Sequence, residues 1–192
     1  MTVHEHATMK LNSKELRKVD PHAVAQARDE LKRQNLFLIL ENIFDTYNIG
    51  GLFRLADGLG VAHMYLCGET TPPPNNRIHK ASCGTYKVVP WTYCASVADA
   101  LASIRLGLND LGESNKLSVV SVEQSPTSIP YHDFKATYPI AVIVGNETTG
   151  VTQNTLALCD HTLEIPMWGI NKSLNVIVSA GIVSYHIASQ QM

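Results

Sequence analysis

Three short polar stretches follow strongly apolar runs in this sequence, and their side chains could bind or orient a ligand. In "IAVIVGNETTG", from Ile140 to Gly150, five apolar residues lead directly into Gly145, Asn146 and Glu147. An amide donates and accepts hydrogen bonds and a carboxylate only accepts them, while a residue without Cβ lets a ligand approach the backbone. Because a carboxylate beside a buried strand costs free energy unless it is paired, Glu147 has a role in a site, caps the next helix or pairs with an arginine.

The other two stretches have the same character. After "LFLILEN" the chain reads "IFDTYNIGGLFR", in which Asn48 precedes two glycines and Arg54 follows one helical turn later. After "HTLEIPM" it reads "WGINKSLN", in which Ser173 and Asn175 precede an almost wholly apolar segment. No Gly-x-Gly-x-x-Gly follows a strand, and no glycine-rich run ends in Lys-Ser or Lys-Thr. The two common motifs that bind nucleotide phosphates are therefore excluded.

The elements that position these stretches alternate along the chain. Runs typical of strands occupy residues 36–42, 63–68, 116–123, 138–145 and 161–167, and helical patterns occupy 49–59, 96–109, 152–158 and 173–189. "YKVVPW" could add an edge strand that Pro90 ends, and residues 69–85 form the longest irregular stretch. Alternating strands and helices predict an α/β fold, a mostly parallel sheet with helices on both faces. Ligands bind such sheets at the carboxyl ends of the strands, where all three polar stretches lie.

Length and composition are those of one domain, since 192 residues at 45% hydrophobic suffice for a single well-buried core. No apolar run reaches the roughly 18 residues of a membrane span, and the first ten residues lack the apolar region of a secretory signal. We therefore expect a soluble, cytoplasmic protein with no membrane partner. The four cysteines show no CxxC spacing, which favours reduced buried thiols over disulfides, and no metal site is predicted.

Charge is unevenly distributed along the chain. The net charge is -2, yet seven of the 15 lysines and arginines lie within the first 35 residues. In that segment Asp20 and Pro21 are typical of the start of a helix over residues 21–34. Its basic residues could contact nucleic-acid phosphates or form an ordinary solvated helix face, and the charge pattern alone leaves both open.

The motifs "NIGGLFRLADGLGV", "VGNETTGV" and "IPMWGINKSLNVIVSAGI", in this order and spacing, resemble the three signature motifs of the SpoU/TrmH branch of the SPOUT methyltransferases. "HKASCGTYKVVPW" resembles a further segment of that family, and the likeness spans about residues 36–190. Gly51 and Leu55 stand where the family often has Ala and Thr, which affects only local packing. The chain is therefore predicted to divide into a basic helical extension (residues 1–35), which rests on the charge pattern, and a SPOUT domain (residues 36–192), for which the resemblance implies a C-terminal trefoil knot and a homodimer that pairs through the last helix.

The resemblance also implies S-adenosylmethionine (S-adenosyl-L-methionine) as methyl donor and a ribose 2'-hydroxyl of structured RNA as acceptor. By motif position, Arg54 orients the hydroxyl and a phosphate, Asn48 and Glu147 hold Arg54 and the ribose, and Ser173 and Asn175 place the target nucleotide. An isolated arginine is a poor base, because its pKa exceeds about 12. Cofactor contacts are assigned by motif position to Val122, Gly145, Asn146, Ile165, Met167, Ser173 and Leu174. Ser173 and Leu174 would also serve as helix cap and core residue.

Three functions remain open at this stage. A 2'-O-methyltransferase is favoured, with tRNA preferred over rRNA because the N-terminal extension is compact. A SPOUT-like RNA-binding dimer without activity is disfavoured by the intact Arg54, Glu147 and Asn175, and an unrelated dinucleotide enzyme by the absent glycine fingerprint. The last helix is apolar around most of its circumference, which predicts a homodimer unless the helix at 21–34 covers its second face.

Overall fold

A single parallel sheet forms the centre of the protein in the computed structural model, which describes residues 11–18, 33–110 and 117–191. Its strands are β1 (Gln34–Glu41), β2 (Val61–Cys67), β3 (Trp91–Cys94), β4 (Ser118–Val122), β5 (Ile129–Pro130), β6 (Ile140–Val144) and β7 (His161–Glu164). Their order is β3-β2-β1-β6-β4-β7-β5, and every neighbouring pair in the described chain is parallel. The predicted α/β class is confirmed, while the trefoil knot stays a prediction.

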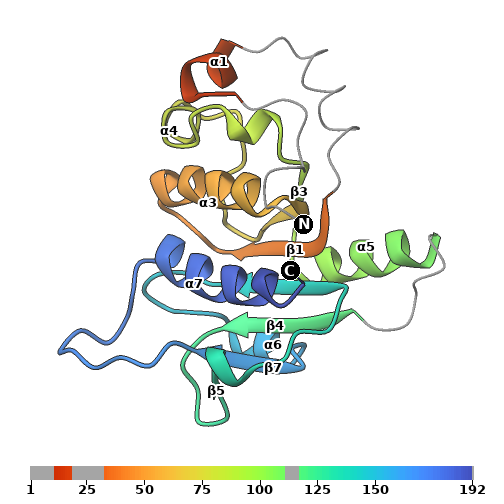
Figure 1. The fold of residues 1–192 in the computed structure, drawn as a ribbon, viewed down its shortest axis with the longest axis vertical. Helices are drawn as coiled ribbons and strands as arrows, with labels where there is room; N and C mark the ends of the chain where they lie inside the picture. Colours follow the sequence, from red (N-terminus) through yellow and green to blue (C-terminus); the bar gives the residue numbers. More distant parts are fainter. Residues whose placement is uncertain (1–10, 19–32, 111–116, 192) are drawn as a thin grey trace.

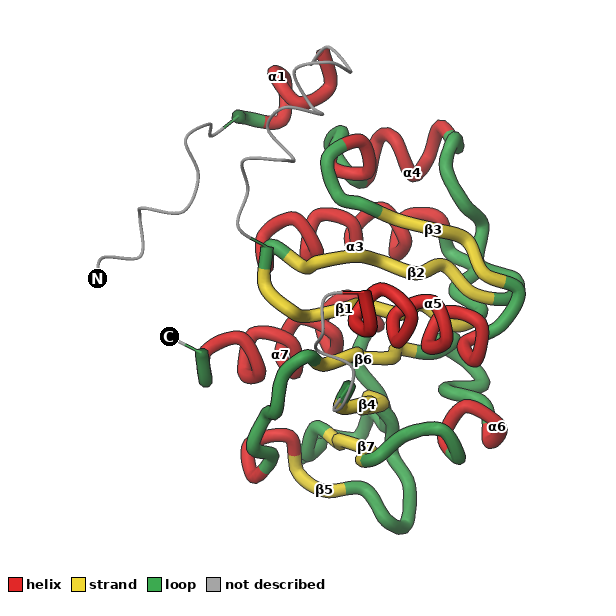
Figure 2. The backbone as a smooth tube through the Cα atoms, turned by 90° about the vertical axis from the view of Figure 1, so that its right-hand side faces the viewer, coloured by secondary structure: helices red, strands yellow, loops and turns green. Residues whose placement is uncertain are grey.

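Helices cover both faces of this sheet, as Figures 1 and 2 show. The helices of the described chain are α1 (Ser13–Lys18), α3 (Thr46–Leu59), α4 (Asn76–Ala81), α5 (Val97–Asp110), α6 (Gln153–Leu156) and α7 (Val176–Ser189), with 3-10 turns η1 (Thr85–Lys87) and η2 (Tyr131–Asp133); α1 and α4 lie outside α3 and do not cover the sheet directly in Figure 1. Side chains alternate along a strand, so Leu38 and Leu40 of β1 join the core under α3 and α7, whereas Ile39 joins the core under α5. No helix within the described residues is long and apolar enough to cross a membrane.

The two helices that carry the predicted site are fixed at their ends. The Asp45 side chain caps α3 by accepting a hydrogen bond from the Tyr47 N–H at 2.8 Å, and Gly60 ends the helix with a φ of 62°. Asn175 caps α7 by accepting from the Ile177 N–H at 2.9 Å. α3 packs between α4 and α7. The first turns of α3 and α7 are thus held at the carboxyl edge of the sheet.

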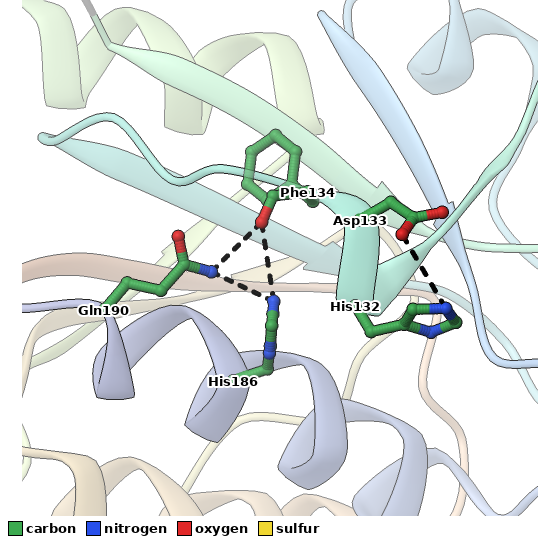
Figure 3. Close-up of polar contacts among 5 residues, drawn as sticks. All are labelled: His132, Asp133, Phe134, His186 and Gln190. Carbon is green, nitrogen blue, oxygen red and sulfur yellow. Dashed lines mark hydrogen bonds and ion pairs between the residues drawn. The ribbon is translucent and has the colours of Figure 1, made fainter.

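The far end of α7 is tied to the η2 turn (Figure 3). Gln190 donates to the Phe134 carbonyl at 3.1 Å, and its side-chain nitrogen also lies 3.0 Å from His186 Nε2. His186 Nε2 lies 3.4 Å from the same carbonyl. In the adjacent pair, His132 Nε2 lies 3.8 Å from a carboxylate oxygen of Asp133. These contacts hold α7 at its C-terminal end, away from the polar turns.

Several predicted boundaries differ from the structure. The edge strand expected in "YKVVPW" is wrong: the Gly84 carbonyl accepts from the Lys87 N–H, which winds residues 85–87 into η1, and strand β3 begins only after Pro90. The irregular stretch at 69–85 contains α4, capped by Asn75. The last helix begins at Val176 and not at 173, and β7 ends at Glu164, which leaves residues 165–167 as loop. The predicted helix at 21–34 lies mostly outside the described residues, and Gln34 itself belongs to β1.

Candidate active site

Three strand ends meet at one edge of the sheet because β1, β6, β4 and β7 are consecutive neighbours. Asn48, in the first turn of α3 and 8% exposed, donates from Nδ2 to Glu147 Oε1 at 2.5 Å. Asn175 donates from its Nδ2 to Asn48 Oδ1 at 3.0 Å. One chain of hydrogen bonds therefore joins residues from all three polar stretches. Glu147 and Asn175 follow Asn48 in the sequence by 99 and 127 positions, respectively. Glu147 neither caps α6, which Thr152 caps, nor pairs with an arginine in the described chain.

The Gly145–Asn146 turn is held by the Asn146 side chain and by the backbone hydrogen bond from the Gly150 N–H to the Asn146 carbonyl at 2.9 Å. Asn146 is 5% exposed, accepts from the Thr148 N–H at 2.8 Å and donates to the Asn42 carbonyl at 2.9 Å. A Cβ on Gly145 would collide with the backbone of Gly150. The expectation that Gly145 makes room for a ligand is therefore incomplete, because its own turn already occupies the space beside it.

A cavity of about 360 Å³ opens beside this turn, between the ends of β4, β6 and β7 and the start of α7. All seven predicted cofactor residues line it: Val122, Gly145, Asn146, Ile165, Met167, Ser173 and Leu174. Glu147 lines it as well. This volume lies within the range of small-molecule and cofactor sites, roughly 300–1,000 Å³. The structure brings these residues together around one cavity, and their role in binding stays a prediction.

Carboxylates dominate the charged lining of this cavity. Glu123, Glu147 and Glu164 line it together with one cation, Lys172. Glu123 accepts from the Val151 N–H at 2.9 Å, and a Cβ on Gly150, whose φ is 70°, would collide with this carboxylate. The cavity therefore favours a ligand that carries positive charge and hydroxyl donors, and it disfavours one that carries phosphates.

Sequence reasoning missed residues that brace the cavity. Gln124 donates to the Lys172 carbonyl at 2.7 Å and so ties the end of β4 to the loop before α7. Glu41, 6% exposed, accepts from the Thr152 N–H at 2.9 Å and from the Thr155 hydroxyl at 2.6 Å. Both Glu41 and Glu123 end or follow a buried strand. The signal used for Glu147, an acidic residue at the end of an apolar run, would have identified them.

Arg54 lies outside the cavity lining. It is exposed on α3, and its side chain makes no hydrogen bond or ion pair with any other residue that the structure describes. The predicted contact by which Asn48 and Glu147 would hold Arg54 is not present, because these two side chains bind each other. Ser173 lines the cavity and is exposed. Arg54 is thus available to an external partner that approaches α3.

Two of the four cysteines, Cys67 and Cys159, are poor nucleophiles because of burial. Burial, with the neighbouring Cys94 as a lesser cause, raises the pKa of Cys67 to about 12, and burial raises the pKa of Cys159 to about 11. All four cysteines are free, although only Cys67 is fully buried. The described residues contain no group of three or more His, Cys, Asp or Glu that could hold a metal ion. The arrangement therefore suits orientation of a ligand and its reaction partner more than covalent catalysis by a thiol.

The fold and the site define an α/β protein with a parallel sheet. Its cavity lies at the carboxyl ends of the strands and has the size of a cofactor site. The chain belongs to the SpoU rRNA Methylase family, whose sequence pattern it matches over residues 35–185.

Relatives and solved structures agree with this family. The chain is 29% identical over 161 residues to the 23S rRNA (guanosine-2'-O-)-methyltransferase RlmB of Vibrio parahaemolyticus, covering 82% of this chain and 60% of that enzyme. The crystal structure of the SpoU methyltransferase AviRb from Streptomyces viridochromogenes superposes with a TM-score of 0.74 at 25% identity, over 83% of this chain and 61% of that one. AviRb has also been solved with the cofactor AdoMet. The A. aeolicus TrmH/SpoU tRNA modifying enzyme gives a TM-score of 0.71 at 26% identity, over 93% and 82% of the two chains.

The chain spans about three fifths of the length of the curated relatives named RlmB that it matches first.

Proposed function

We propose that this protein transfers a methyl group from S-adenosylmethionine to a ribose 2'-hydroxyl of RNA. The observation that carries the proposal is the cavity at the ends of β4, β6 and β7, together with the hydrogen-bonded chain Glu147–Asn48–Asn175 at its edge. RlmB is named as a guanosine-2'-O-methyltransferase, and the family description names rRNA methylation. Both support the same reaction.

The cavity suits this cofactor by its chemistry. Adenosylmethionine, when bound, supplies an electrophilic methyl group on a sulfonium centre. Three carboxylates face a single lysine in the lining, which favours a cationic ligand with ribose hydroxyls over the diphosphate of NAD. We assign its binding to the seven predicted residues, with Glu123 and Gln124 as supports for the loops that carry them. Lys172 is placed to pair with a carboxylate of the ligand.

The protein's own groups have positioning tasks in this proposal. A ribose hydroxyl does not ionise unaided near pH 7, so orientation and local polarisation supply much of the catalysis. Arg54, exposed and without a partner among the described residues, holds the hydroxyl and an RNA phosphate. Asn48 fixes the Glu147 carboxylate next to the cavity, where it accepts a hydrogen bond from the target ribose. Ser173 and Asn175 place the nucleotide.

Ribosomal RNA is the substrate class we propose, with tRNA second. The expectation of tRNA rested on the compact N-terminal extension alone. RlmB acts on 23S rRNA by its name, and this weighs more than the tRNA modifying enzyme among the similar structures. The division into a basic extension (residues 1–35) and a catalytic domain (residues 36–192), and a cytoplasmic location, stay part of the proposal.

A homodimer is also proposed, because large exposed apolar side chains occur on α7, at the start of α3, which packs against α7, and in the loop before α7. Val178 and Tyr185 of α7 are 47% and 49% exposed, Phe44 and Tyr47 near the start of α3 are 53% and 56% exposed, and Trp168 in the cavity loop is 92% exposed. Exposed apolar side chains that gather in one region mark an interaction site. A second copy, related by twofold symmetry, would cover them.

Two assays test the proposed function. Titration calorimetry should show binding of adenosylmethionine and adenosylhomocysteine and no binding of NAD. Labelled methyl groups should then pass to unmodified 23S rRNA transcripts more readily than to tRNA. If the protein binds adenosylmethionine and RNA but transfers no label to either RNA, the chain is a binding module. If NAD binds and adenosylmethionine does not, the cavity assignment is wrong.

A further inference from the structure

The short helix α1 is packed against the α4–η1 segment. Lys87 donates from Nζ to the Arg17 carbonyl at 3.2 Å, and Arg17 donates to Cys83 Sγ at 3.7 Å. A Cβ on Gly84, whose φ is 95°, would lie 2.9 Å from the backbone of Leu16. The Leu16 side chain packs against the main core. Residues 11–18 and 75–88 therefore form one continuous surface, which we call the α1–α4 surface.

This surface carries a strong excess of positive charge. Its cations are Lys14, Arg17, Lys18, Arg77, Lys80 and Lys87, and all except the half-buried Lys87 are exposed. Glu15 is the only acidic residue in the two segments, and its carboxylate accepts from the Asn12 N–H at 2.7 Å. No ion pair joins any of these cations to another described residue. Six of the 15 lysines and arginines of a chain with net charge -2 thus lie on one surface.

The α1–α4 surface adjoins the helix that carries Arg54. A Cβ on Gly50 of α3 would lie 2.5 Å from Ala81 Cβ and 2.9 Å from the Ser82 nitrogen, so the end of α4 touches the first turns of α3. Gly50 lies two residues after Asn48 and one turn before Arg54. Figure 1 shows α1, α4 and α3 in succession, with α7 beyond α3. A ligand that reaches the Asn48–Arg54 turn can therefore extend across α4 to α1.

We propose that the α1–α4 surface binds the phosphate backbone of the RNA substrate at a distance from the methylated nucleotide. That the bound anion is RNA rests on the proposed function. That it binds at the α1–α4 surface rests on the positive charge of this surface. Closely spaced exposed cations without acidic partners release counterions when they meet phosphates, which makes binding depend steeply on salt. The surface supplies affinity, while the cavity and Arg54 supply the reaction.

Paired variants test this directly. The side chains of Arg77 and Lys80 make no hydrogen bond or ion pair with described residues, so Arg77→Gln/Lys80→Gln removes two charges without removing such a bond. Arg105→Gln/Lys135→Gln is the matched control, because these exposed cations lie on α5 and after η2, outside the α1–α4 surface. Binding of a 23S rRNA transcript would be measured from 50 to 300 mM salt. Melting temperature and adenosylmethionine affinity would verify that both variants are folded.

The expected result is that the steepness with which log K decreases with log salt falls by about 1.4 to 1.8 for Arg77→Gln/Lys80→Gln, since each lost phosphate contact contributes about 0.7 to 0.9. The control should change the slope by less than about a third of that. Lys14→Gln/Lys18→Gln should give a fall similar to that of the first pair. Equal slopes in the surface and control variants would overturn the proposal. Binding of poly-glutamate would be measured in parallel as a probe for an acidic protein partner. If the surface variants lose poly-glutamate binding but keep the wild-type salt slope for RNA, the proposal is overturned and the surface is assigned to an acidic protein.

Failure of the proposed function would have a different signature. A wild-type protein that shows the surface-dependent salt slope but transfers no methyl group would refute the reaction and leave the α1–α4 surface as an RNA-binding site. If the wild-type protein methylates RNA but the surface variant and the control variant have equal salt slopes, the proposed reaction stands and the proposed RNA-binding role of the α1–α4 surface is refuted.

Discussion

Swapping the amide and the carboxylate of the Asn48–Glu147 hydrogen bond tests this site with little change in side-chain shape. In Asn48→Asp, the side chain can still accept from Asn175, but the donor that faces Glu147 at 2.5 Å becomes a second carboxylate. In Asn48→Asp/Glu147→Gln, donor and acceptor change places, so the hydrogen bond can form again in the opposite direction. Shape is nearly constant through the series.

The expected energies follow from charge and exposure. Two carboxylates about 4 Å apart repel by about 4 kcal/mol at an effective dielectric constant of about 20. Glu147 is exposed, so rotation into water and salt screening reduce this to about 2 kcal/mol. Asn48→Asp should therefore lower the free energy of unfolding by about 2 kcal/mol at pH 7. The double variant should recover most of that loss.

Acid should relieve the defect of the single variant. Repulsion raises the pKa of one carboxyl of the pair in the folded state above its unfolded value of about 4. The folded state then binds a proton more readily, so the stability difference from wild type is largest at pH 7 and shrinks as the pH falls toward 4.5. Urea unfolding at these two pH values measures this, with Asn48→Ala as the uncharged control.

Activity separates the structural role of the pair from its chemical role. The double variant should be stable yet transfer methyl groups at least about tenfold more slowly, the equivalent of about 1.4 kcal/mol of lost transition-state stabilisation, because it lacks the carboxylate at position 147. The reasoning is refuted if the double variant is no more stable than Asn48→Asp, or if it regains wild-type turnover.

Four further outcomes are expected. Arg54→Ala should abolish methyl transfer and leave the Kd for adenosylmethionine within a few-fold, as measured by calorimetry; wild-type turnover would contradict its assignment. Gly150→Ala, which forces a Cβ into the Glu123 carboxylate at a φ of 70°, should lower the free energy of unfolding by about 1 to 3 kcal/mol in urea and weaken cofactor binding. Because burial raises the pKa of Cys67 from 9.0 to about 12 and that of Cys159 to about 11, the folded state retains protons that the unfolded chain loses, so stability should fall above pH 9, with Cys67 contributing up to about 1.4 kcal/mol per pH unit; Cys67→Ala should reduce that slope by this contribution and leave the contribution of Cys159. Light scattering should give a mass near twice 21.0 kDa, and Val178→Glu should yield a monomer; an active wild-type monomer would exclude the dimer.

Periodicity and strand-end logic were enough to predict that the three polar stretches lie together. Alternation of Leu38, Ile39 and Leu40 between the two faces of the sheet and the regular succession of helices specify a parallel sheet. The polar residues that follow β1, β6 and β7 then have to meet at one edge. That Asn48 lies beside Glu147 depends on β1 and β6 being neighbours in the sheet, and the sequence predicted neither this strand order nor the direct hydrogen bond between the two side chains.

Other features depended on contacts that no local pattern contains. The six-residue α1 has one apolar anchor, Leu16, and the two-residue β5 is too short for any period. The Gly84 backbone turns the chain into η1 and displaces the expected strand past Pro90. Gly145 was interpreted as space for a ligand, but the backbone of Gly150 fills that space. Such close approaches between distant or looped segments are set by tertiary packing alone.

The position of the transferred methyl group tests the central claim most directly. Unmodified 23S rRNA would be incubated with the protein and labelled adenosylmethionine, digested to nucleosides and analysed by mass spectrometry, with Arg54→Ala in parallel. The account predicts label on the ribose 2'-oxygen of a nucleoside for the wild-type protein and none for the variant. Label on a base, or equal labelling by the variant, would contradict it.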